Sequence, residues 1–70
     1  MAHPSEVVRR LRAQAGLTQE ELAQRSGLRF SFVRSVEQGR NALSAYDKRQ
    51  ALAKGLGVSL VDFASMLDAR

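Results

Sequence analysis

The feature that most constrains the fold is Gly27, which separates two short amphipathic stretches in QEELAQRSGLRFSFVRSVEQ, residues 19–38. Glycine readily adopts the positive φ with which a helix ends and the chain reverses. Ala23, four residues earlier, is small enough to let a second helix cross closely. The stretch therefore predicts two short helices held at a fixed angle, followed by Gly39 and Arg40.

The second of these helices, expected over 30–38, has two unlike faces. Leu28, Val33 and Val36 turn toward a core, and the polar or exposed positions are Phe30, Ser31, Arg34, Ser35 and Gln38. A face left free on a rigidly held helix, in a basic protein, is the geometry that reads the major groove of DNA. We therefore expect double-stranded DNA as the partner.

Three further helices are expected, and no strand. Thr18 caps the first helix of the pair described above, as part of a capping box, TQEE. Of the three others, Pro4 opens one that Gly16 stops, and Ser59 caps another. The remaining helix begins at Ser44 or Ala45 and ends in the stretch 55–57. Residues 1–70 thus predict a single domain, a compact all-α five-helix bundle, with the following core residues: Val8, Leu11, Leu22, Val33, Val36, Leu56 and Phe63.

The net charge of +4 is concentrated in one part of the chain. Six basic residues lie in 29–54 against two acidic ones, so this segment carries +4 and the rest balances to zero. A polyanion would dock there, although a generic solvated basic surface remains an alternative. We expect Lys48, Arg49 and Lys54 to form such a solvated helix face.

Other classes of function find little support. No apolar run approaches the roughly 20 residues that span a bilayer, and the N-terminus does not resemble a signal peptide, so a cytoplasmic location without membrane contact is expected. With no cysteine and His3 as the one histidine, no metal or other cofactor is expected. Glu20 and Glu21 are adjacent on a helix and would point about 100° apart, so their carboxylates would not converge on one catalytic site. We do not expect an enzyme.

The segments LTQEELAQRSGL, FVRSVEQGR and LAKGLGVSLVDF resemble the phage-repressor and Cro-like helix-turn-helix proteins, often called the Xre family. The resemblance extends from about Val8 to Phe63 and implies a lambda-repressor-like DNA-binding domain. FVRSVEQGR is also similar to a run in the HipB-type antitoxin branch of the family.

The resemblance implies roles for particular residues. Gln19 would contact the DNA backbone and brace the recognition helix, and Arg12 and Glu37 would form a structural ion bridge. Base edges would be met by Phe30, Ser31 and Ser35, with Arg34 beside them. Phosphate would be held by Gln38, Arg40 and the loop that contains Asn41.

Two positions depart from the family pattern. Arg29 stands where a serine or threonine commonly caps the recognition helix, so it would reach for phosphate instead. Phe30 stands where a polar residue is common, and it would press on a thymine methyl group or simply pack.

The helix after Ser59 carries more apolar residues than one buried face requires: Leu60, Val61, Phe63, Met66 and Leu67. This excess predicts a homodimer through the C-terminal helix, with a core helix that carries a spare apolar stripe as the alternative. The leading hypothesis is a transcriptional repressor that binds a palindromic operator as a homodimer. Two alternatives stay open: the antitoxin of a toxin–antitoxin pair, with a toxin protein as a further partner, and a protein-interaction module on the same scaffold.

Overall fold

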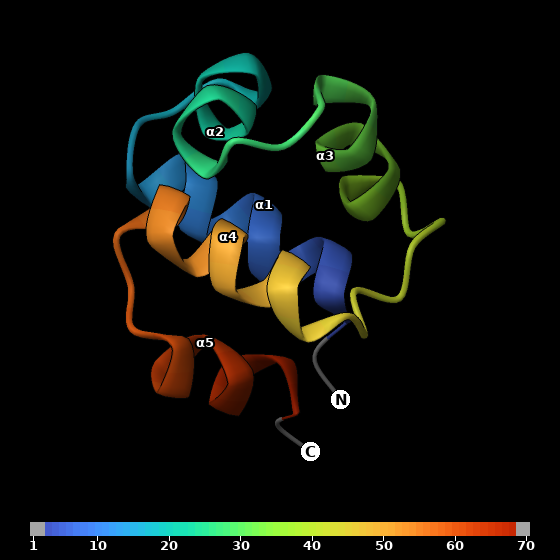
Figure 1. Cartoon of the computed structure of the whole chain (residues 1–70), viewed down its shortest axis with the longest axis vertical. Coiled ribbons are helices and arrows are strands. Elements are labelled where there is room, and N and C mark those ends of the chain that lie inside the picture. Colours follow the sequence, from blue (N-terminus) through green and yellow to red (C-terminus); the bar gives the residue numbers. More distant parts are fainter. Residues whose placement is uncertain (1–2, 69–70) are drawn as a thin grey trace.

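The computed structural model describes residues 3–68, which form five helices and no strand. They are α1 (Pro4–Gln14), α2 (Gln19–Ser26), α3 (Phe30–Glu37), α4 (Tyr46–Leu56) and α5 (Leu60–Leu67). Figure 1 shows α1 and α4 in the middle of the molecule, with α2 and α3 toward one end and α5 at the other. The predicted all-α five-helix bundle is confirmed.

Three helices begin with a side-chain cap. Pro4 occupies the first turn of α1, as predicted, and the cap itself is His3, whose Nδ1 accepts the backbone N–H of Ser5 at 3.2 Å. In the capping box of α2, Glu21 N–H donates to Thr18 Oγ1 at 3.1 Å and Thr18 N–H donates to Glu21 Oε1 at 2.9 Å. Hydrogen bonding to the Glu21 carboxylate, chiefly by the backbone N–H of Thr18 and then by its hydroxyl, favours the charged form and holds the pKa of Glu21 below its usual value. Ser59 caps α5 by accepting the N–H of Asp62.

The turn between α2 and α3 has the predicted form. Gly27 has a φ of 69°, and Leu28 N–H donates to Ala23 O at 3.0 Å across it. Such a bond satisfies a carbonyl at the end of α2 that would otherwise lack a partner. Because Ala23 is buried between the two helices, the angle between α2 and α3 is set by packing as well as by the turn.

The core confirms all seven predicted residues and adds others from every part of the fold. Leu28, which was also expected to turn inward, is only partly buried and packs against the core from its edge. The complete set of buried apolar residues is Val7, Val8, Leu11, Leu17, Leu22, Ala23, Val33, Val36, Leu43, Leu52, Ala53, Leu56, Phe63 and Leu67. Leu43 is the unexpected member, because it belongs to the loop between α3 and α4.

Gly55 is the penultimate residue of α4, at a point where residues of α2 pack against it. A Cβ atom at this position would lie 3.2 Å from Leu22 Cδ1 and 3.1 Å from the backbone nitrogen of Ser26, and would overlap the hydroxyl of Ser26. Glycine is therefore needed here for close approach between α2 and α4, and α3 in turn packs against α2 and α1. Among residues 3–68, no helix has the length and apolar content to span a membrane.

Candidate nucleic-acid interface

Helix α3 buries one side and presents the other to solvent. Val33, Val36 and Glu37 are buried against the rest of the domain. Phe30, Ser31, Arg34 and Gln38 are exposed, and Ser35 is half-buried. The predicted division of this helix into a core face and a free face is confirmed.

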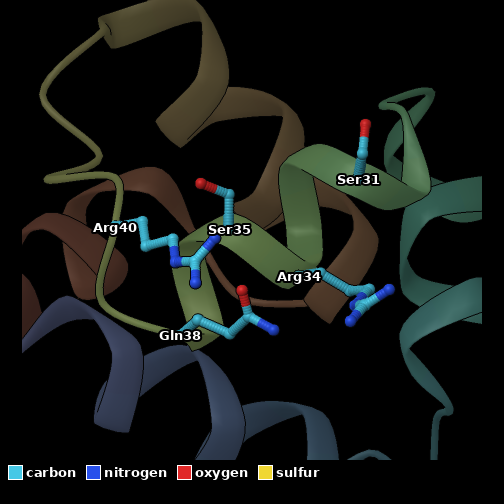
Figure 2. Close-up of a pocket in the computed structure, with 5 residues that line it drawn as sticks. All are labelled: Ser31, Arg34, Ser35, Gln38 and Arg40. Carbon is cyan, nitrogen blue, oxygen red and sulfur yellow. The ribbon is translucent and has the colours of Figure 1, made fainter.

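Five side chains gather in an open depression along the free face. It is lined by Ser31, Arg34, Ser35, Gln38 and Arg40. Figure 2 shows four of them on α3 and the last turn of the helix, with Arg40 reaching back from the following segment to lie beside Ser35. Two guanidinium groups, an amide and two hydroxyls make a surface rich in hydrogen-bond donors with a net positive charge. This combination suits phosphates and base edges.

Phe30 and Arg34 interact with each other, one helical turn apart. The guanidinium carbon of Arg34 lies 5.7 Å from the centroid of the Phe30 ring, within the range of a cation–π contact. The Phe30 ring is attached at the first position of α3 and 39% of the residue is exposed. The contact therefore supports Arg34 on the outward face.

A buried carboxylate fastens the inner side of α3 to two other helices. Glu37 accepts hydrogen bonds from Arg12 Nε at 2.8 Å and Arg12 Nη2 at 3.0 Å. Arg12 Nη1 also donates to the carbonyl of Leu17, at 2.9 Å, in the turn before α2. Since the Glu37 side chain is only 2% exposed, its carboxylate has lost its hydration, and these hydrogen-bond donors compensate for that loss. The ion bridge expected from the resemblance is confirmed.

Gln19 completes this network from the start of α2. Its Nε2 donates to Glu37 Oε1 at 3.2 Å, which links the first turn of α2 to the last turn of α3. The expected bracing role of Gln19 is confirmed. Its expected contact with the DNA backbone remains a proposal.

The loop after α3 is held by contacts that the sequence pattern did not reveal. Asn41 Oδ1 accepts the N–H of Leu43 at 2.8 Å, and Arg49 Nε donates to the carbonyl of Leu43 at 2.7 Å. The expectation that Arg49 belongs to a solvated helix face was wrong. It is half-buried because its guanidinium crosses from α4 to the loop, and Nη2 lies 3.7 Å from Asp68 Oδ1.

Lys48 is likewise only partly solvated. Its Nζ lies 5.6 Å from the centroid of the Phe32 ring, so it connects α4 with α3. Lys54 is exposed, as expected.

The structure thus places the nine predicted site residues in four locations. Five share the depression described above. Arg29 and Phe30 lie at the start of α3, where Arg29 occupies the N-cap position without forming a side-chain cap. Gln19 lies on the neighbouring helix α2. Asn41 lies in the loop, where its side-chain oxygen accepts the backbone N–H of Leu43. Among residues 3–68, no group of acidic or imidazole side chains is arranged to hold a metal ion.

Comparisons with known proteins agree with this geometry. The model of a helix-turn-helix domain matches residues 5–66. A protein of Sinorhizobium fredii, described as the uncharacterized HTH-type transcriptional regulator y4dJ, is 40% identical over 62 residues, which is 84% of this chain and 75% of that protein.

Two crystal structures of the restriction–modification controller protein C.Esp1396I are also similar. The wild-type structure has a TM-score of 0.79 and 33% identity over 94% of this chain and 86% of its own. A point variant has a TM-score of 0.82 and 35% identity over 94% of this chain and 82% of its own. The relatives are thus a transcriptional regulator and a controller protein, and not enzymes.

Proposed function

The chain belongs to the helix-turn-helix family of DNA-binding transcriptional regulators and is not an enzyme; from that premise, we propose that it is a repressor that binds a palindromic operator as a homodimer. The observation that carries the proposal is the depression on α3, whose donors come from the free side of the helix and from Arg40 just after it, while the other side of the helix is fixed by Arg12. An α-helix with its side chains is about 10–12 Å across, which matches the roughly 12 Å width of the major groove.

Within this proposal the side chains divide into two sets. Ser31, Arg34 and Ser35, with Phe30 beside them, face base edges. The second set contacts phosphates and sets the register of the helix on the duplex; its members are Gln19, Arg29, Gln38, Arg40 and the loop at Asn41. An arginine that meets guanine binds O6 and N7 together, so we assign Arg34 the largest share of sequence discrimination.

Helix α5 supplies the proposed homodimer contact. Val61 is 78% exposed and Met66 is 36% exposed. At 100° per residue the two lie on opposite flanks of the buried stripe of α5, which contains Phe63 and Leu67. A two-fold interface would cover one flank of each copy. Pairing at this end would leave both α3 helices free, about 34 Å apart for successive major grooves.

Occlusion of a promoter is the simplest mechanism for a domain of this size, and the proposal places the protein in the cytoplasm with its DNA. The similarity to C.Esp1396I favours a second candidate role, the control of restriction–modification genes. Both roles use the same contacts with DNA.

The proposal is tested by selecting DNA sequences from a randomised pool and measuring their affinity by fluorescence anisotropy at several salt concentrations. We expect the selected DNA sequence to be palindromic. Its affinity should fall steeply as the salt concentration rises, because phosphate contacts release counterions. Weak binding to every sequence would contradict the proposal. A protein partner, such as a toxin, would then be sought by pull-down.

Replacement of Arg34 with alanine should weaken binding to the selected operator by about 1–3 kcal/mol and relax the preference at one base pair. Lys54→Ala provides the matched control, because Lys54 is an exposed cation on α4 outside the depression. Both variants should melt at the temperature of the unaltered protein. Equal operator affinities for the two variants would show that Arg34 does not contact a base.

The homodimer is tested by sedimentation of the unaltered protein and of three variants. Val61→Glu or Met66→Glu should shift the protein toward monomer, because a carboxylate placed in an apolar interface loses its hydration. Gln14→Glu, at an exposed position of α1 outside the proposed interface, controls for added charge. An unaltered protein that stays monomeric on its operator would contradict the proposed dimer.

A further inference from the structure

The side chain of His3 does more than its capping role requires. Its Nδ1 accepts the backbone N–H of Ser5 at 3.2 Å and lies 2.7 Å from Ser5 Oγ. An imidazole nitrogen that accepts a backbone N–H carries no proton, so the proton of the neutral ring is on Nε2. The ring therefore presents one N–H donor on the side away from the cap.

The ring of His3 also packs against the end of the recognition helix. A Cβ atom at Gly39 would lie 3.4 Å from His3 Cε1 and 4.0 Å from His3 Nε2. Gly39 is the residue between Gln38 and Arg40, and both of these side chains line the depression on α3. The start of α1 thus meets the edge of the depression through His3.

Capping alone does not explain a histidine at this position. Asparagine, aspartate, serine and threonine cap a helix with a short side-chain oxygen. The imidazole ring is longer and spans from the cap to Gly39. Among residues 3–68, Nε2 has no hydrogen-bond partner, and His3 is exposed to solvent.

We propose that His3 is a further DNA-contact residue. Its Nε2–H donates to a phosphate of the DNA backbone at the edge of the major groove, near the phosphate contacts proposed for Gln38 and Arg40. This inference rests on the proposed function of α3. The neutral ring supplies the donor while its other nitrogen keeps α1 capped. Like other phosphate contacts, His3 would help to fix the position of the protein on the duplex without recognising a particular base.

The test compares His3→Asn with the unaltered protein on the selected operator. Asparagine can still cap α1, so stability should be unchanged, whereas affinity should fall about 3- to 10-fold through loss of one hydrogen bond. Single operator phosphates are then replaced by neutral methylphosphonates, one at a time. At one phosphate in each half-site, the replacement should abolish the difference between His3→Asn and the unaltered protein.

Two results would overturn the inference while leaving the function of α3 intact. One is an affinity of His3→Asn equal to that of the unaltered protein. The other is an equal loss for His3→Asn at every phosphate position, which would show that His3 acts only on the fold. Failure of the unaltered protein to prefer any DNA sequence would instead overturn the proposed function, and the role of His3 with it.

Discussion

Arg12→Ala is expected to lower the free energy of unfolding by about 3–5 kcal/mol, because it leaves the buried Glu37 carboxylate without its cationic partner. Both carboxylate oxygens of Glu37 accept from Arg12, and the one remaining donor among residues 3–68 is Gln19 Nε2. The carbonyl of Leu17 loses its bond from Arg12 as well. Since domains are stable by only about 5–15 kcal/mol, much of this protein's stability would be lost.

Urea unfolding followed by circular dichroism measures this effect. Arg10→Ala is the control, because Arg10 is an exposed arginine on the same helix. The double variant Arg12→Met with Glu37→Met should be more stable than Arg12→Ala, since it leaves no uncompensated charge. A loss below about 1 kcal/mol, the range of a surface ion pair, would show that the network contributes little.

Leu43→Ala is expected to cost about 2–5 kcal/mol, the range for a large side chain removed from a core. Leu43 is only 1% exposed although it lies in a loop, and it has a positive φ of 54°. Its N–H and carbonyl are both bonded, to Asn41 and Arg49. Because the side chain holds the loop against the core, its loss should also displace Arg40 and reduce affinity for DNA.

Thermal unfolding and operator titration check the two effects. Val58→Ala is the control, because Val58 is only partly buried and lies between α4 and α5, outside the depression on α3. We expect a smaller loss of stability for Val58→Ala, with unchanged affinity per folded molecule. Should Leu43→Ala bind the operator as tightly per folded molecule as Val58→Ala, Leu43 would not anchor the loop.

The helices and the free face of α3 were visible in the sequence because their causes are local. The capping box at Thr18, the glycine turn at Gly27 and the cap at Ser59 act within three or four residues. The apolar residues of α3 recur at helical spacing, which likewise involves residues only three or four positions apart. These signals sufficed to predict the five helices, the core face of α3 and the side chains on its other face.

The tertiary structure alone decided how distant segments meet. It places the Leu43 loop in the core, turns Arg49 from solvent to that loop, and brings His3 from the start of the chain to Gly39 after α3. Each of these contacts joins residues through packing between elements, and no local periodicity encodes which element will lie next to another.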